Sequence, residues 1–363
     1  MTRVFVTEGK RTAMGAFGGR HAARTAIELA VDAVAALPLD GVEEVVLGNV
    51  VSAGLGQAPA RQVAIGAGLP ATTPAYAVDR VCASGLQAIL LAGRGLRDGG
   101  RAVAVGAESM SRAPFLDDAA RFGRKFGDAA LRDALHWDGL RDFLDGSAMG
   151  VAADRLAAAQ GYSREECDAW AAESVARARA AAARRAAEIV GDEDDEPLAR
   201  CLPEKLARLR PAFSPDGVTT PGNASPLTDG AAAVLLATEP EDGSAEILGW
   251  ASESGPPGEF VARPVDAIRR LLAAHDLRPA DVDLFEINEA FAVGALHAAW
   301  ALELDSARVN AEGGAVALGH PLGASGVRLV LTLRRQLIAR GGGLGVACAC
   351  VGGGEAVAVL LRV

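Results

Sequence analysis

The sequence contains an internal repeat at an offset of 241 residues, in which Ala83-Ser84-Gly85 recurs as Ala324-Ser325-Gly326. In each copy an apolar helical segment follows, then a glycine (Gly100 or Gly341), and then a buried strand. A chance match of three residues is the alternative, but the shared helix, glycine and strand argue against it. The repeat therefore predicts two similar halves with the same order of elements.

Strands and helices alternate along both halves. We expect strands at 4–7, 44–47, 75–78, 101–105, 231–237, 246–250, 282–287 and 344–347, and helices at 25–37, 60–68, 86–96, 265–275 and 290–302. This alternation is typical of a layered α/β fold, and we expect its central strands to be largely parallel.

The segment 115–225 differs from the two halves in composition. It carries many charges and prolines, an Ala/Arg run at 163–190 that predicts an amphipathic helix, and an acidic run at 192–196 that predicts a solvated loop. We therefore expect three parts. Residues 1–114 form an N-terminal half that is completed by about 226–242, residues 115–225 form an inserted loop domain, and residues 243–363 form the C-terminal half.

Composition excludes several classes of function. The net charge of −10 argues against a general role at nucleic acids or membrane surfaces. Five cysteines in 363 residues do not suggest a disulfide framework, and no Cys/His cluster has zinc spacing, so we expect no metal. The sequence shows neither an apolar signal region nor an apolar run of membrane-spanning length, which predicts a cytoplasmic protein without membrane insertion.

His320 lies in a glycine-rich stretch, from Ala311 to Gly326, and is followed directly by Pro321. Glycines let a backbone turn sharply and approach a ligand closely, and a histidine held in such a loop suits proton transfer near neutral pH. The alternative is a strand-to-helix turn whose histidine only caps or packs.

Cys82 precedes the helical segment of the first repeat copy and aligns with Gly323 in the second. A helix N-terminus favours the thiolate and lowers the thiol pKa, which predicts a nucleophile. The alternative is a small buried apolar side chain. If the two copies are related by a pseudo-dyad, the loops of Cys82 and His320 face each other across one pocket.

Two further stretches carry candidate groups. Cys350 is followed by three glycines, including Gly352, whose N–H groups suit an oxyanion site. A redox or metal pair of Cys348 and Cys350 is the rival interpretation, and we expect the two side chains to point to opposite faces of their strand, which weighs against it. Asn288 and Glu289 follow a strand; Asn288 is either an N-cap or a group that polarises a carbonyl, and Glu289 a first-turn charge.

Together these motifs resemble the thiolase family over nearly the whole chain. The motifs that carry the resemblance are Arg11-Thr12, residues 54–62, Val81-Cys82-Ala-Ser-Gly-Leu-Gln-Ala, residues 107–111, residues 209–213, residues 222–230, Asn288-Glu-Ala-Phe, Gly319-His320-Pro-Leu-Gly-Ala-Ser-Gly and Cys350-Val-Gly-Gly-Gly. The resemblance implies two βαβαβαββ halves in a five-layer αβαβα arrangement, with an inserted loop domain.

The resemblance also implies an acyl-CoA C-acyltransferase that makes or cleaves 3-ketoacyl-CoA. Cys82 would become acylated with His320 accepting its proton, and Cys350 would handle the α-proton of a second acyl-CoA. The enolate oxygen would lie near His320 and a water held by Asn288. The N–H groups of Cys82 and Gly352 would meet the acyl-enzyme oxyanion.

Binding residues and partners are likewise implied by the resemblance. Ser225 would lie beside the pantetheine arm of CoA, Phe291 and Met149 near the acyl group, and Arg200 or Arg208 near the CoA phosphates, although solvated loop arginines are an equal alternative. CoA would be substrate or product, with no permanently bound cofactor. A homodimer or homotetramer acting in fatty acid and lipid metabolism is implied.

The chain departs from the family pattern at four places. Asp79 stands where the family usually has Asn, Ala148 where short-chain biosynthetic members have His, and 254–258 stands near the place of a missing Met-Gly-x-Gly-Pro loop before Pro264. The strand before the active-site glycines reads Ala347-Cys-Ala-Cys350, which is also unusual for the family. Two alternative functions stay open: a condensing enzyme of another substrate class, and a CoA- or lipid-binding protein without turnover.

Overall fold

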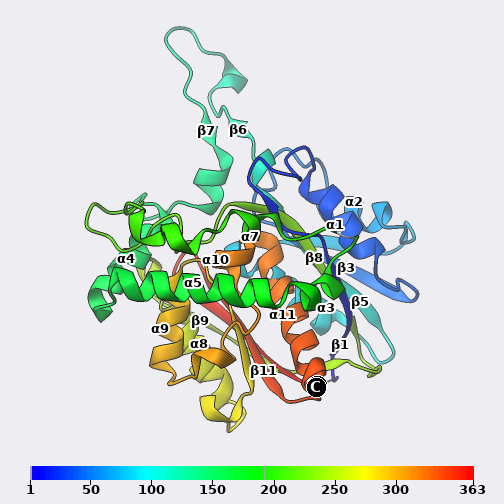
Figure 1. Ribbon diagram of the computed structural model, residues 1–363. Helices are drawn as coiled ribbons and strands as arrows, with labels where there is room; N and C mark the ends of the chain where they lie inside the picture. Colours follow the sequence, from blue (N-terminus) through cyan, green and yellow to red (C-terminus); the bar gives the residue numbers. More distant parts are fainter. Residues whose placement is uncertain (1, 192) are drawn as a thin grey trace.

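The computed structural model describes residues 2–191 and 193–363, and its two halves share one continuous ten-stranded sheet (Figure 1). The N-terminal half contains β1 (Phe5–Arg11), β2 (Gly15–Ala16), α1 (Ala26–Ala35), β3 (Val42–Gly48), α2 (Pro59–Gly66), β4 (Ala75–Val78), the short turn η1 (Val81–Ala83), α3 (Ser84–Gly95), β5 (Arg101–Ser109) and β8 (Thr228–Ala237). The C-terminal half contains β9 (Ala245–Ser254), α8 (Arg263–Ala273), β10 (Leu284–Ile287), α9 (Ala292–Ala301), α10 (Ala315–Leu318), α11 (Leu322–Ala339), β11 (Leu344–Val351) and β12 (Glu355–Arg362).

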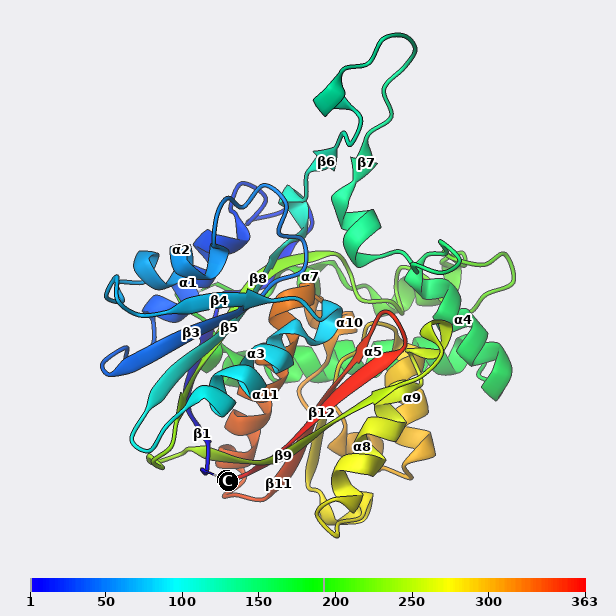
Figure 2. The same cartoon turned by 180° about the vertical axis from the view of Figure 1, so that it is seen from behind.

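Helices cover both faces of the sheet and also separate its two halves. α3 and α11 lie in the middle and pack on both halves, α1 and α2 cover the outer face of the N-terminal half, and α8 and α9 cover the outer face of the C-terminal half (Figure 2). The expected five-layer αβαβα arrangement is therefore confirmed. Because both faces of β8 are covered, every residue of that strand is buried, which explains the apolar run from Ala231 to Ala237.

The expectation of largely parallel central strands is wrong. The strand order is β10-β11-β12-β9-β1-β8-β5-β3-β4, with β2 paired to β8. Parallel pairs occur at the two ends of this order, whereas the pairs from β11 through β5 are antiparallel. The reason is connectivity: β11 returns to β12 by a tight turn, and β8 and β9 both pair with β1, so no crossover helix intervenes at the centre.

The two repeat copies meet where α3 and α11 begin. A Cβ built on Gly326 would lie 2.3 Å from the backbone N of Leu86, and one built on Gly85 would lie 2.7 Å from the backbone N of Val327. Only glycine allows two helix starts to approach so closely. The repeated Ser-Gly turns therefore mark the contact between the halves, which brings the loops that precede them together.

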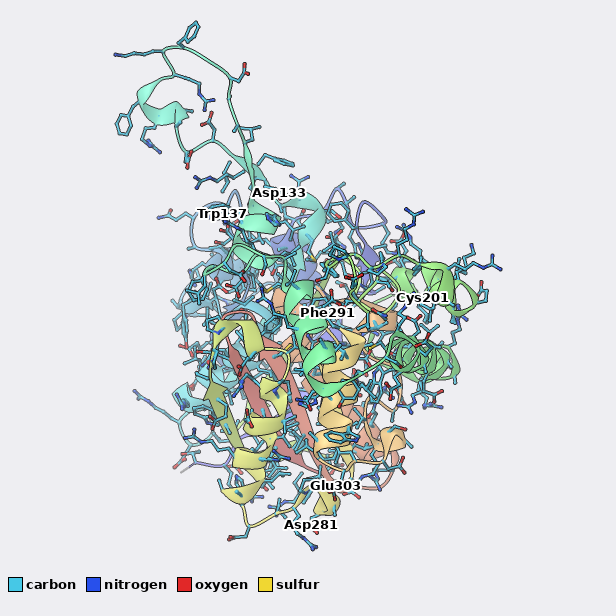
Figure 3. All side chains as sticks on the ribbon, turned by 90° about the vertical axis from the view of Figure 1, so that its left-hand side faces the viewer. Asp133, Trp137, Cys201, Asp281, Phe291 and Glu303 are labelled. Carbon is cyan, nitrogen blue, oxygen red and sulfur yellow. The ribbon has the colours of Figure 1, made fainter. Side chains whose placement is uncertain are left out.

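Residues 115–225 form a projecting arm followed by helices. The arm contains β6 (Phe115–Leu116) and β7 (Arg132–Asp133), and Figure 3 places Asp133 and Trp137 at its base. Then follow a π-helical turn η4 (Leu135–Gly139), α4 (Met149–Gln160), α5 (Arg164–Ala180), α6 (Ala182–Arg185), α7 (Glu196–Arg200) and η6 (Pro203–Arg208). The three-part division of the chain stays a prediction.

Two expectations for this segment need correction. The single helix expected over 163–190 begins with a Ser163–Glu166 capping box but is interrupted at Ala181. The acidic run is not simply solvated, because Asp195 is buried and accepts hydrogen bonds from Arg11, whose side chain is fully buried. A buried guanidinium requires such a partner. Asp192, also in that run, lies outside the described residues.

Candidate active site

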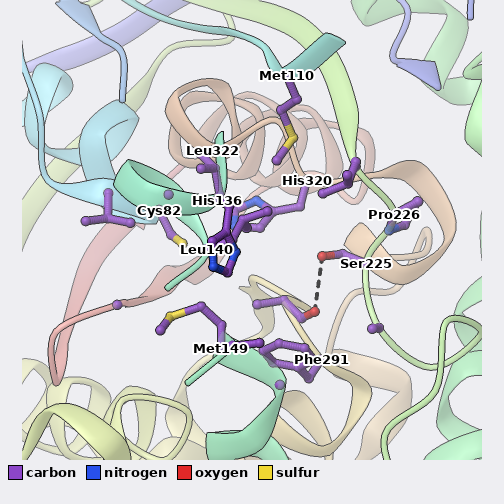
Figure 4. Close-up of a pocket in the computed structure, with 18 of the residues that line it drawn as sticks. Cys82, Met110, His136, Leu140, Met149, Ser225, Pro226, Phe291, His320 and Leu322 are labelled. Atoms are coloured by element: carbon purple, nitrogen blue, oxygen red, sulfur yellow. Dashed lines mark hydrogen bonds between the residues drawn. The ribbon is translucent and has the colours of Figure 1, made fainter. Parts of the chain in front are cut away.

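A cavity of about 270 Å³ lies where the two halves and the inserted segment meet (Figure 4). We call it the central cavity. Six of the residues predicted from the sequence line it: Cys82, Met149, Ser225, Phe291, His320 and Gly352. The loops of Cys82 and His320 therefore face one pocket, as the pseudo-dyad predicts.

Cys82 lies in a strained turn between β4 and α3. The preceding residue, Val81, has a φ of 45°, which is unusual for a β-branched residue. Asp79 Oδ1 accepts the Val81 N–H at 2.8 Å, and Ser84 Oγ accepts the Arg80 N–H at 2.8 Å. Asp79, the departure from the family pattern, thus holds the turn that presents Cys82 to the cavity.

The Cys82 thiol is 7% exposed, and its burial raises its pKa to about 12. The N–H groups of Gly352 and of Cys82 itself oppose this rise. The expectation of a lowered thiol pKa is therefore wrong for this structure, because desolvation of the thiolate outweighs the helix start. At neutral pH the resting site holds a neutral thiol.

A chain of hydrogen bonds fixes His320. Asn288 Nδ2 lies 3.3 Å from His320 Nε2, and His320 Nδ1 lies 2.5 Å from Ser325 Oγ. The Ser325 hydroxyl donates to the Pro321 carbonyl at 2.9 Å, so Nδ1 must carry the proton. Nε2 is therefore free to accept a proton. Burial, and to a lesser extent the charge of Arg328, lower the pKa of His320 to about 3, so the imidazole is neutral at rest.

Asn288 and Glu289 are not parts of a helix start. The N-cap of α9 is Phe291, which overturns the capping interpretation of Asn288. Asn288 Oδ1 is buried and has no hydrogen-bond partner in the described part of the chain. Glu289 is buried too, and it accepts four hydrogen bonds, from Trp170 Nε1, Ser174 Oγ, Asn310 Nδ2 and the Val316 N–H. It ties α5 to the loop that leads to His320.

Cys350 is buried next to Cys82, and its pKa lies well above the ordinary value because of burial and the nearby thiols. The expectation that Cys348 and Cys350 point to opposite faces of β11 is wrong, because side chains alternate along a strand and residues two apart share a face. Both thiols are free. Cys348 packs in the core under α8 and α9, whereas Cys350 packs with Phe291.

Glu108 is a buried carboxylate that the sequence did not single out. It accepts hydrogen bonds from the N–H groups of Val50, Val51 and Gly323 and from Asn49 Nδ2, at 3.0–3.1 Å. Burial raises the pKa of Glu108 to about 7, and the three backbone N–H bonds oppose that rise. Glu108 connects the end of β3 to the start of α11, directly behind both candidate catalytic loops.

The predicted binding residues divide into two groups. Ser225 faces the cavity, and its hydroxyl donates to the Ala290 carbonyl at 3.1 Å (Figure 4). The Phe291 ring packs edge-on against Phe213 at 5.9 Å between centroids. Arg200 lines a neighbouring hollow instead and pairs with Glu196 at 2.6 Å, and exposed Arg208 does not line the cavity.

Within residues 2–191 and 193–363, no group of three or more His, Cys, Asp or Glu side chains is arranged to hold a metal ion. In the same residues no helix has the length and apolarity needed to cross a membrane.

Comparisons with known proteins agree with this geometry. Residues 4–240 match the model of the thiolase N-terminal domain, and residues 242–363 match that of the thiolase C-terminal domain. An acetyl-CoA acetyltransferase from Pseudomonas aeruginosa is 42% identical over 99% of both chains. A probable acetyl-CoA acetyltransferase from Escherichia coli is 40% identical over 100% of this chain and 99% of its own.

A solved structure is similar over the same length. The crystal structure of a thiolase from Ascaris suum in complex with coenzyme A superposes with a TM-score of 0.93, at 38% identity over 99% of both chains. Agreement in sequence, in fold and over the full length leaves one assignment: the chain belongs to the thiolase family and is an acyltransferase.

Proposed function

We propose that this acyltransferase makes or cleaves 3-ketoacyl-CoA through an acyl-enzyme on Cys82, with CoA as substrate or product. The observation that carries the proposal is that Cys82, His320 and the N–H of Gly352 converge on the central cavity. Relatives named acetyl-CoA acetyltransferase and acetyl-CoA acyltransferase support the substrate class.

In the first step Cys82 Sγ bonds to the thioester carbonyl carbon and the bond from that carbon to the CoA sulfur breaks. The Cys82 proton passes to His320 Nε2, and Cys350 donates its own thiol proton to the leaving CoA sulfur, which leaves Cys350 as a thiolate. Because thiol and imidazole are both neutral at rest, the proton leaves as the carbon–sulfur bond forms. The N–H groups of Cys82 and Gly352 stabilise the oxyanion, and losing one such donor typically costs on the order of 10²–10³ in rate.

In the second step the Cys350 thiolate takes the α-proton of another acyl-CoA and becomes a neutral thiol again. The resulting carbanion attacks the carbonyl carbon of acyl-Cys82. The bond from that carbon to Cys82 breaks, the Cys82 sulfur takes the proton from His320, and 3-ketoacyl-CoA is released. The enolate oxygen lies near His320 and a water held by Asn288; the unpartnered Oδ1 of Asn288 within the described residues supports that water. Thiolysis is the reverse sequence.

Covalent acylation tests the assignment. We expect wild-type protein incubated with acetyl-CoA to gain one acetyl group by intact-protein mass spectrometry, and Cys82→Ala to gain none. Cys348→Ala is the matched control, because Cys348 lies in the core away from the cavity, and it should still become acetylated. Acetylation of Cys82→Ala at the wild-type level would exclude Cys82 as the nucleophile.

CoA release from a panel of 3-ketoacyl-CoA chain lengths tests turnover and the acyl preference together. Binding without CoA release from any member would favour a thiolase-fold binding protein over an acyltransferase.

We further propose that Ser225, Phe291 and Met149 contact the pantetheine and acyl groups, since all three line the cavity. A cytoplasmic homodimer or homotetramer acting in fatty acid metabolism fits this chemistry. Two phenylalanines on the arm, Phe122 and Phe126, are 94% and 99% exposed, which supports association; sedimentation measures it.

A further inference from the structure

Few polar side chains face the central cavity. Of its lining residues, only Cys82, His136, Ser225 and His320 have polar or titratable side chains. The Ser225 hydroxyl is bonded to the Ala290 carbonyl, and the proposed chemistry uses both Cys82 and His320. Among the described residues, the hydrogen bonds to histidine rings involve His21, His297 and His320, and none involves His136. His136 therefore offers the cavity an imidazole that the proposed chemistry does not use.

The η4 turn that carries His136 is held in place by contacts on both of its sides. Leu135 is buried in a cluster with Cys82, Met110 and Leu322, and Asp133 Oδ1 accepts its N–H at 2.9 Å. On the outside, the Trp137 ring contacts two guanidinium groups.

Those guanidinium groups belong to Arg132 and Arg141, at 4.4 and 4.2 Å from the ring centroid of Trp137. With Leu135 fixed inward and Trp137 fixed outward, His136 lines the cavity, and Figure 4 shows it among the lining side chains. A π-helical turn is rare and frequently marks a functional site.

The ligand chemistry follows from the surroundings. The rest of the cavity wall near His136 is apolar, including Leu140, Met149 and Leu322. A CoA thioester carries two secondary amides in its pantetheine arm, and an amide that enters such a cavity without a partner costs about 1–3 kcal/mol. His136 is exposed, so it lies at the mouth of the cavity and not at its floor.

We propose that His136 is a positioning residue that hydrogen-bonds an amide of the pantetheine arm and so holds the thioester over Cys82. This inference rests on the proposed function, since it requires a CoA thioester in the central cavity. It concerns substrate binding and adds no step to the chemistry.

The test compares two substrates in wild-type protein and in His136→Phe, which keeps a flat ring but removes the hydrogen bond. For thiolysis of acetoacetyl-CoA, we expect KM to rise about tenfold with kcat nearly unchanged. For the S-ethyl thioester of acetoacetate, which has no pantetheine amide, we expect the same kcat/KM in both proteins. Asp138→Asn, on the same exposed turn, is the matched control and should resemble wild type with both substrates.

Two results would overturn the inference: an unchanged KM for acetoacetyl-CoA, or an equal loss with both thioesters, which would indicate a merely structural role. Binding of desulfo-CoA, measured by calorimetry, separates this inference from the proposed function. The affinity for desulfo-CoA should fall about tenfold in His136→Phe, whether or not either protein turns over substrate. A wild-type protein that binds desulfo-CoA without turnover would contradict only the proposed function.

Discussion

Replacing Ser325 with alanine removes the acceptor that fixes the protonated nitrogen of His320. Ser325 Oγ lies 2.5 Å from His320 Nδ1, and both side chains are buried. Without the hydroxyl, the buried Nδ1–H is left without its hydrogen-bond acceptor, which costs about 1–3 kcal/mol. If that cost falls on the orientation and tautomer that transfer the proton, kcat/KM falls by roughly 5- to 150-fold.

Steady-state thiolysis of acetoacetyl-CoA measures this effect, and thermal unfolding followed by circular dichroism checks that the variant is folded. Ser306→Ala, at an exposed serine far from the cavity, is the control and should retain wild-type kinetics. A folded Ser325→Ala protein with kcat/KM within twofold of wild type would refute the role assigned to Ser325.

Two other perturbations test the packing and the protonation of the site. Gly326→Ala should lower the free energy of unfolding by about 3 kcal/mol, because the new Cβ would lie 2.3 Å from the backbone N of Leu86. Gly258→Ala is the control: its Cβ would meet the Arg155 guanidinium at 3.4 Å, so the free energy of unfolding should change by no more than ~0.5 kcal/mol. Urea denaturation compares the two variants. His320 should make the free energy of unfolding depend on pH. Its pKa is about 3 in the folded protein and about 6.5 in the unfolded chain, so the unfolded chain binds the proton at higher pH. The folded state therefore loses stability as the pH falls from 6.5 towards 3. Between pH 7 and pH 4 wild type should lose about 3 kcal/mol more than His320→Asn in urea denaturation, and an equal loss in the two proteins would contradict a neutral buried imidazole.

The Ala-Ser-Gly repeat predicted the relation of the two halves because its glycines lie where the two halves touch. Two helices that start against each other need glycine at the crossing, so Gly85 and Gly326 recur at equivalent places. The same logic led to Cys82 and His320, since each lies in the loop before one of these crossings. Cys350 and Gly352 were predicted from a different feature, the cysteine followed by three glycines near the end of the chain.

Other site residues left no comparable local signal. Glu108, Glu289 and Ser325 act through partners elsewhere in the fold, and nothing adjacent to them in the sequence reveals those partners. His136 lies in an irregular turn within a charged segment, where a lone histidine is ordinarily a surface residue. A search for buried carboxylates bonded to backbone N–H groups could have found the two glutamates, but only with a structure in hand.

Periodicity, glycine placement and reactive side chains were enough to predict the layered α/β architecture and the two related halves. The same features carried the thiolase resemblance and pointed to the candidate catalytic residues. Tertiary structure decided the direction of the central strands, the buried role of Asp195, the neutral states of Cys82 and His320, and the orientation of His136. Desolvation and hydrogen-bond partners set these properties, and both depend on segments that are far apart in the chain.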